Sequence, residues 1–292
     1  MYDRILVSQY IATDPTYIQR SSFKMKVVLS RKGFDSSNGG IVSPIFEDGT
    51  MISFPIPSDD SDQFSDLHYK GVSYLDILSD LHYKGGKYCH VDPDLDQARR
   101  ITTVNEWTPA FGQIDSSATY LKNIGIKEGD LFLFFGNFHH VEKTNGHYRY
   151  IRKSGDFYKD RDLQVVWGYL QVGRIIDDPS EQKQLWWHPH SNKSRRNNKT
   201  NVIFEASEKL SFDENKPGAG LLSFDVKRVL TLENNNKATW KKNAVYDTEH
   251  ILCNRRNSAK NPNEGLYYAG IWQELGLAES EECIAWAKTI VL

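Results

Sequence analysis

Two long apolar runs stand out in the pattern of hydrophobic and polar positions. Residues 131–135 (LFLFF) form the most apolar segment, and 164–176 (QVVWGYLQVGRII) is rich in β-branched and aromatic residues. Apolar runs without polar alternation are typical of strands that are covered on both faces. We therefore expect both segments to be buried strands in the centre of a sheet. The polar stretch 139–163 between them should project as a loop or hairpin, with His139 and His140 gating a pocket.

Shorter patterns predict the remaining elements. The predicted strands are 26–30, two short strands within 41–57, 201–207 and 229–232, and the predicted helices are 115–124 and 279–292. These strands and helices do not alternate in a regular βαβ rhythm. The expected fold is α+β, with a mixed, largely antiparallel sheet or partly open barrel and flanking helices. The Asn/Lys-rich segments 191–200 and 233–237 read as solvated loops.

The chain reads as a single domain over residues 25–292, with loop insertions. Residues 1–24 lack a sustained period and precede a second methionine, so they are either a peripheral arm or an over-extended gene start.

Composition and charge limit the possible partners and the cellular location of the protein. The net charge of −2 gives no global basic field, so a nucleic-acid partner would have to meet a local patch. The three cysteines are not spaced as a disulfide or CxxC framework, which favours reduced thiols. No apolar run approaches the length of a membrane span, and no basic-then-apolar leader is evident. We therefore expect a cytoplasmic protein without a membrane partner.

A dense polar stretch, SRKGFDSSNGG (30–40), directly follows the strand at 26–30. Glycines at a strand end allow the backbone to approach a ligand closely. The candidate ligand-binding residues here are Arg31, Lys32, Asp35, Ser36, Ser37, Asn38, Gly39 and Gly40. The cations suit phosphate, whereas the other side chains offer acceptors and hydroxyls. The alternative is a hairpin turn, because Asp, Ser, Asn and Gly all favour turns.

Histidines mark two further candidate segments. His90, Asp92 and Asp94 alternate in YCHVDPDLD, so on a strand they would share one face. A histidine with carboxylates can bind a metal or act as a general base, although a surface turn explains the pattern too.

The other segment is WWHPHSNKSRRNNK. Here Trp186, His188 and His190 precede a cationic cluster that suits base stacking and phosphate pairing. The alternative is an exposed loop whose tryptophans cover the core. No metal-binding spacing is recognisable, so no residue is assigned as a metal ligand and the cofactor is unknown.

Several separated blocks together resemble the nucleotide modification associated domain family, third type. They are SRKGFDSSNGG, SPIFEDGTMISFPIP, HVDPDL, FGQIDSSATYLKNIGIKEGDLFLFFGNF, VVWGYLQVG and HPH. The resemblance covers about 25–292. It adds Gln113 to the ligand-binding set and Glu274 to the catalytic set, although the residues around Glu274 depart from the family pattern. A fainter similarity links GDLFLFFGNF and VVWGYLQVGRI to the paired strands of PUA-like (ASCH and EVE) domains.

The family is known mainly from phage and bacterial gene neighbourhoods that modify or restrict DNA bases. The resemblance therefore implies a DNA-modification or defence setting, a nucleotide or nucleic-acid partner, and partner proteins of a base-modification system. Our leading hypothesis is an enzyme in which Asp35, His90, Asp92 and Glu274 form the catalytic set, with His90 and Asp92 transferring protons. The alternatives are a non-catalytic reader of modified bases, in which Trp186 stacks on the base, and an interaction subunit without a site.

Overall fold

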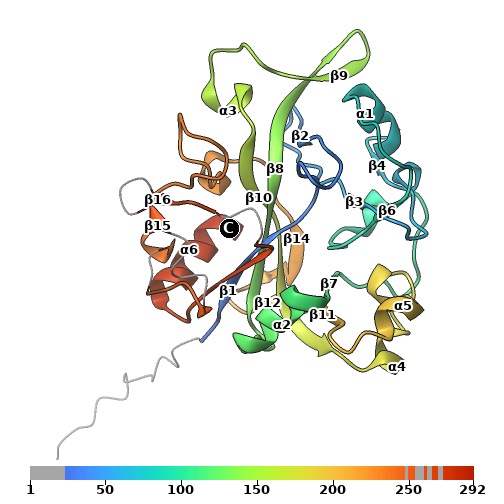
Figure 1. Ribbon diagram of the computed structural model, residues 1–292, viewed down its shortest axis with the longest axis vertical. Coiled ribbons are helices and arrows are strands. Elements are labelled where there is room, and N and C mark those ends of the chain that lie inside the picture. Colours follow the sequence, from blue (N-terminus) through green and yellow to red (C-terminus); the bar gives the residue numbers. More distant parts are fainter. Residues whose placement is uncertain (1–23, 247–248, 254–259, 262–264, 269–271) are drawn as a thin grey trace, which may run out of the picture.

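A nine-stranded mixed sheet forms the centre of the molecule (Figure 1). The computed structural model describes residues 24–246, 249–253, 260–261, 265–268 and 272–292. The main path of the sheet runs β17–β1–β8–β10–β11–β7, and β14, β2 and β9 pair at its sides. The expected α+β class with a largely antiparallel mixed sheet is confirmed, and backbone pairing does not close the described strands into a barrel. The prediction for residues 1–24 falls, apart from Lys24, outside the described residues.

The elements are short except for two central strands. The sheet strands are β1 (Val27–Arg31), β2 (Ser43–Ile45), β7 (Ala110–Gln113), β8 (Leu131–Thr144), β9 (His147–Tyr150), β10 (Leu163–Ile176), β11 (Val202–Ala206), β14 (Ala219–Leu221) and β17 (Glu274–Leu277). Short two-stranded pairs are β3 (Ile56–Pro57) with β6 (Cys89–His90), β4 (His68–Tyr69) with β5 (Val72–Ser73), β12 (Lys209–Leu210) with β13 (Asp213–Pro217), and β15 (Lys260–Asn261) with β16 (Gly265–Leu266).

The α-helices are also short. They are α1 (Tyr74–Asp80), α2 (Asp115–Asn123), α3 (Phe157–Asp160), α4 (Pro179–Gln182), α5 (Lys193–Arg196) and α6 (Glu281–Val291). Single 3-10 turns add η1 (Phe64–Asp66), η2 (Gln97–Arg99), η3 (Pro189–Ser191), η4 (Val226–Arg228) and η5 (Ala244–Tyr246). No helix among the described ranges is both long enough and apolar enough to cross a membrane.

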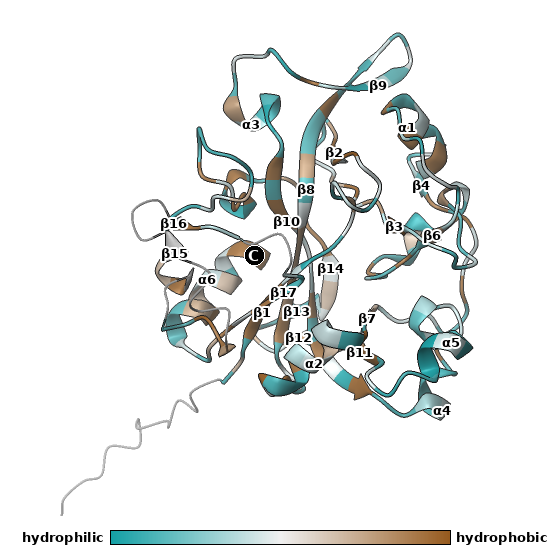
Figure 2. Cartoon of the chain, in the orientation of Figure 1, coloured by the Kyte–Doolittle hydropathy of each residue, from teal (hydrophilic) through white to brown (hydrophobic). Residues whose placement is uncertain are grey.

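The apolar runs form the middle of the sheet, as predicted. β8 and β10 pair antiparallel, and their first ten residues are all buried. Figure 2 shows hydrophobic colour along these strands and polar colour towards β9. The predicted helices 115–124 and 279–292 correspond to α2 and α6, and 201–207 to β11. The strand prediction for 229–232 is wrong, because these residues make only isolated bridges. The expected loop 191–200 contains α5 and the end of η3.

Side chains bring the two edges of the sheet together. β17 and β7 stand at opposite ends of the strand order. Nevertheless, Gln113 Nε2 at the end of β7 donates to Glu274 Oε1 at the start of β17, over 2.5 Å. β1 lies between β8 and β17, with Ser30 opposite Glu274. The curled sheet therefore has a seam, closed by side chains, where β1 and β7 end and β17 begins.

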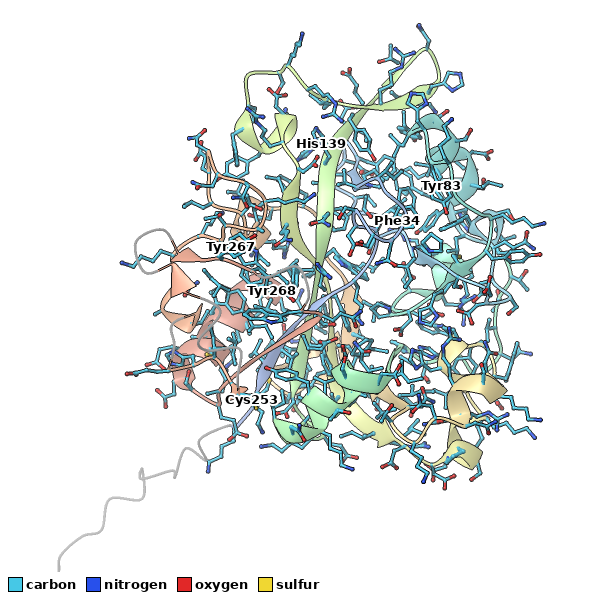
Figure 3. All side chains as sticks on the ribbon, in the orientation of Figure 1. Phe34, Tyr83, His139, Cys253, Tyr267 and Tyr268 are labelled. Carbon is cyan, nitrogen blue, oxygen red and sulfur yellow. The ribbon has the colours of Figure 1, made fainter. Side chains whose placement is uncertain are left out.

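A second hydrophobic core stands beside the main one and carries the β3–β6 pair. Its members come from residues 34–91 and Val141, and they include several aromatic rings. Phe34 and Tyr83, labelled in Figure 3, pack with ring centroids 5.3 Å apart. This core anchors both sides of the loop after β1 and holds Cys89 at the start of β6. His90 follows Cys89 directly, so the second core places this histidine against the main sheet.

The gating role predicted for His139 and His140 is wrong. β8 continues through both residues. The projecting hairpin begins only at Val141 of β8, which pairs with Tyr150 of β9. His139 is fully buried and hydrogen-bonds to Asp162 and the Ile151 carbonyl, and Figure 3 places it towards the upper end of β8. His140 packs against the Phe224 ring, with centroids 4.5 Å apart. These histidines are satisfied or packed members of the interior.

His140 should make the protein less stable in acid. Burial, assisted by the charges of His139 and Lys159, lowers the pKa of His140 from 6.5 to about 4. Between those values the unfolded chain binds a proton that the folded chain does not, so this contribution to stability is lost as pH falls from 6.5 towards 4. In this range the free energy of unfolding of the wild type should fall by up to about 1.4 kcal/mol for each pH unit because of His140. We expect His140→Phe to remove this part of the pH dependence. Urea denaturation of both proteins at several pH values measures it, and parallel pH profiles would contradict it.

Candidate active site

A cleft of ≈ 230 Å³ opens at the seam of the sheet. Its walls come from the end of β1 and the following loop, the residues around β6, the end of β7, and the η3–α5 segment. The sequence-predicted residues that line it are Arg31, Lys32, Asp35, Asn38, His90, Asp92, Gln113 and His190. These predicted residues come from four segments that are distant in sequence, and two further segments add Ile56, Ser58 and Gln273 to the lining.

Glu274 lies directly behind this lining. It is fully buried, and Ser30 Oγ donates to its Oε1 over 3.0 Å. The same oxygen accepts from Gln113 Nε2 and lies 3.6 Å from Lys32 Nζ. Glu274 therefore contacts Gln113 and Lys32 from behind the cleft wall, and the catalytic role predicted for it stays a prediction.

The loop after β1 lines the cleft with some of its residues and forms a turn with others. Gly33 lines the cleft with a φ of +91°, and an added Cβ would stand 2.3 Å from Ser53 Oγ. Asp35 Oδ1 accepts the backbone N–H groups of Ser37 and Asn38 over 2.8 and 2.7 Å, so this carboxylate closes a turn. Its Oδ2 lies 3.7 Å from Arg31 Nη2.

The second half of the loop forms the turn itself. Ser36, Ser37, Gly39 and Gly40 do not line the cleft. Gly39 and Gly40 have φ values of +89° and +73°, and an added Cβ on Gly39 would stand 2.2 Å from the Phe34 ring. The stretch SRKGFDSSNGG therefore both lines the cleft and forms a turn: Asp35 and Asn38 take part in both, and the remaining residues after Asp35 belong to the turn alone.

Two substitutions of Asp35 should separate its turn from its charge. Asn retains an oxygen that can accept both N–H groups, whereas Ala does not. We expect Asp35→Ala to lower the free energy of unfolding by about 0.5–2 kcal/mol, the range for removing a capping side chain. Asp35→Asn should cost less than about 0.5 kcal/mol. Urea denaturation measures both, and equal losses would argue against the turn.

Three side chains converge on one wall of the cleft. Asp92 Oδ2 lies 3.8 Å from His90 Nε2 and 3.9 Å from His190 Nε2. Each of the three residues offers one potential ligand atom within 4.8 Å of those of the other two. The His90 and His190 rings are 5.2 Å apart, and both residues are buried. Two imidazoles and a carboxylate that face one point can transfer protons or hold a metal ion.

Asp92 is oriented by donors behind it. Its Oδ1 accepts the Gly112 N–H over 2.7 Å and lies 3.1 Å from Nε2 of the buried His188. Burial opposes ionisation, but the hydrogen bond from His188 and the nearby histidine charges hold the pKa of Asp92 well below its usual range. His188, predicted to bind ligand, therefore positions Asp92 from outside the cleft.

Each converging histidine has a partner on its other ring nitrogen. His90 Nδ1 lies 2.7 Å from Asp60 Oδ2, and His190 Nδ1 lies 2.7 Å from Asn201 Oδ1. Asp60 also pairs with Arg195, whose Nη2 lies 3.0 Å from Oδ2. Although burial opposes it, hydrogen bonds from His90 and Arg195 lower the pKa of Asp60 below its usual range. Both imidazole rings are therefore fixed in orientation.

No sequence pattern marked Asp60 or Asn201 as supporting residues. Asp60 lies in the acidic segment SDDSDQFSD, which has the composition of a solvated loop, and Asn201 follows an Asn/Lys-rich stretch. The predicted shared face of His90, Asp92 and Asp94 is wrong, because β6 ends at His90. Asp94 turns instead towards Arg100, whose Nη2 donates to it over 2.8 Å.

The cleft's cations already have carboxylate partners. Arg31 pairs with Asp35 and Lys32 with Glu274, and Lys32 Nζ also lies 4.4 Å from the centre of the Phe111 ring. An incoming phosphate would therefore have to share these cations with the carboxylates.

The tryptophan pair stands apart from the cleft. Trp187 is buried, and Trp186 is 64% exposed. Their rings are perpendicular, with centroids 6.2 Å apart. Among the described residues that line the cleft there is no Trp, Tyr or Phe. The stacking predicted for Trp186 therefore has no counterpart at this cavity.

Comparison with known proteins gives one match. No curated protein and no solved structure matches the chain, so the similarity to PUA-like domains stays a prediction. The family model described as nucleotide modification associated domain 3 matches residues 26–277, a range that includes every segment of the cleft. Because this match covers most of the chain, the protein belongs to the nucleotide modification associated domain 3 family.

Proposed function

We propose that the protein is an enzyme that acts on a nucleotide or on a base in nucleic acid. The observation that carries the proposal is the convergence of His90, Asp92 and His190 at the cleft. Three buried ionisable groups are costly to gather in one place without a compensating role, and such clusters are typical of reactive centres. Membership of a nucleotide modification associated family supports the nucleotide as substrate.

The other cleft residues suit recognition of a nucleotide. The Asn38 and Gln113 side chains both line the cavity and can hydrogen-bond a base or sugar edge. Arg31 is 18% exposed at its side chain and can exchange Asp35 for a phosphate oxygen. A cleft of ≈ 230 Å³ suits one nucleotide, so a base in a duplex would have to be flipped out of the stack.

The histidines can supply the proton transfer. Burial lowers the pKa of His190 to about 3, so its imidazole is neutral at physiological pH and is a weak base that holds a proton only transiently. His90 has the carboxylate Asp60 on its other nitrogen, an arrangement that orients a general base. Asp92 stabilises the positive charge that either ring would gain.

Mass spectrometry of nucleosides tests the proposal. DNA, RNA and the free nucleotide pool are compared between cells that express the wild-type chain and cells that express His190→Ala. We expect a nucleoside that depends on the wild type and is lost in the variant. The matched control is His147→Ala, because His147 is an exposed histidine that also pairs with an aspartate, Asp80.

Identical nucleosides in all three samples, with each protein present and folded, would overturn the enzymatic proposal. If the purified wild type then bound a modified nucleoside, the non-catalytic reader would replace it.

A further inference from the structure

We infer that His90, Asp92 and His190 form a binding site for a divalent first-row transition metal ion. The sequence spacing assigned no metal ligand, and the inference depends on where the hydrogen atoms of the cluster must lie. It rests on the same cleft as the proposed enzymatic function, and a metal ion held by these nitrogens would polarise a bound water or substrate in place of the proton transfer proposed for the two histidines. Metal binding is nevertheless measured without any substrate, so either proposal can fail while the other holds.

The orientation of His190 is fixed by a chain of amides. Gln182 Nε2 donates to the carbonyls of Ile176 and Asn201, over 3.2 and 3.0 Å. The Gln182 oxygen must then accept from Asn201 Nδ2, which lies 2.8 Å away. The remaining Asn201 oxygen faces His190 Nδ1. Because an amide oxygen only accepts, Nδ1 carries the hydrogen and Nε2 presents a lone pair to the cleft.

His90 is oriented in the same sense by a carboxylate. Asp60 receives hydrogen bonds from Arg195 and from Asn192 Nδ2, the latter over 2.9 Å, and both are donors only at these atoms. An ionised Asp60 accepts the hydrogen on His90 Nδ1, so His90 Nε2 also presents a lone pair. A carboxylate behind a ligating histidine is the usual arrangement at protein metal sites.

Asp92 completes the set with one oxygen. The His190 backbone N–H donates to His188 Nδ1 over 3.3 Å, so the ring hydrogen of His188 stands on Nε2 and points at Asp92 Oδ1. That oxygen also accepts from Gly112. Asp92 Oδ2 is left facing the two imidazoles, which places His188 behind the cluster as a positioning residue.

The result is three acceptor atoms that face one point with no hydrogen between them. Such a gathering is unfavourable by itself and becomes favourable around a cation. Two imidazole nitrogens and one carboxylate oxygen suit Zn²⁺, Fe²⁺ or Co²⁺ better than Mg²⁺ or Ca²⁺, which prefer oxygen ligands. No fourth His, Cys, Asp or Glu in the described part of the chain joins the group, so positions remain for water or substrate.

A bound ion would also change the charge of the cleft. Four carboxylates in and behind the lining outnumber its three cationic side chains, which are already paired. A divalent cation would reverse this balance. An anionic substrate would then meet a positive charge that the surrounding carboxylates do not fully neutralise. Three protein ligands with open positions are typical of metals that act on a substrate.

Titration of the metal-free full chain with Co²⁺ tests the inference. We expect one Co²⁺ per chain, visible absorption bands, and a higher melting temperature for the wild type. We expect His90→Ala and His190→Ala to bind at least about 100-fold more weakly, and Asp60→Asn about 10–100-fold more weakly, because it alters only the partner of a ligand. Elemental analysis of protein purified from cells then distinguishes zinc from iron.

The matched control is His147→Ala. His147 Nδ1 lies 2.7 Å from Asp80 Oδ1, the same distance as from His90 Nδ1 to Asp60 Oδ2, but among the described residues His147 has no second histidine opposite it. This variant should bind Co²⁺ as the wild type does. If the ligand variants fail to fold, the wild type remains informative, because bound Co²⁺ should shift one exchangeable N–H proton signal from each of His90 and His190. A wild type without stoichiometric Co²⁺ binding, or unchanged affinity in both folded ligand variants, would overturn the inference.

Discussion

Replacing Phe134 with Ala is expected to lower the free energy of unfolding by about 3–5 kcal/mol. Phe134 is fully buried in β8, and its ring centroid lies 5.1 Å from Phe111 and 5.9 Å from Trp167. Its removal loses the transfer free energy of the ring and leaves a cavity that the paired strands β8 and β10 cannot easily fill. Urea denaturation with the linear extrapolation measures the change.

Trp186→Ala is the matched control for this prediction. Trp186 is a larger aromatic residue, but it is 64% exposed. Its removal should change the free energy of unfolding by no more than about 0.5 kcal/mol. Similar losses for both substitutions would mean that β8 does not form the centre of the core.

The central strands could be predicted because their signal is local. A run such as LFLFF, with no polar alternation, can be satisfied only by cover on both faces, so its position in the sheet follows from composition. Composition did not predict the burial of His139 and His140, where polar residues continue the buried strand. His139 is buried because Asp162 and the Ile151 carbonyl bond to its ring nitrogens. Those partners lie 23 and 12 residues away and are invisible to a pattern of hydrophobicity.

The sequence predicted a catalytic set of Asp35, His90, Asp92 and Glu274, and it did not group His190 with His90 and Asp92. His90, Asp92 and His190 each stood out by residue type, but their convergence depends on β7 carrying Gly112 against Asp92. That contact exists because the edges of the curled sheet meet at the seam. Sequence spacing holds no information about such a closure. Likewise Asp60, thirty positions from His90, resembles its solvated neighbours until the fold places it behind the imidazole.

Gly112→Ala is expected to reduce formation of the modified nucleoside by about 100-fold, the loss that a displacement of about 1 Å can cause at a reactive centre. An added Cβ would stand 2.3 Å from Cγ and Cδ2 of His190. The His190 ring cannot move away easily, because it is 3% exposed and its Nδ1 is bonded to Asn201. The two residues must separate, so His190 Nε2 leaves its position opposite Asp92. Overpacking should also lower the free energy of unfolding by about 1–3 kcal/mol.

Gly86→Ala is the matched control, because an added Cβ there meets nothing within 4 Å. It should leave nucleoside formation and stability unchanged, which separates the effect of contact with His190 from that of replacing any glycine. Nucleoside mass spectrometry and urea denaturation of both variants give the comparison. Full product formation by Gly112→Ala would mean that the position of His190 against β7 does not matter to the reaction. A methyl group on a strand residue with free space beside it costs little. A large effect at Gly112 and none at Gly86 would therefore show that activity depends on the close approach of η3, which contains His190, to β7.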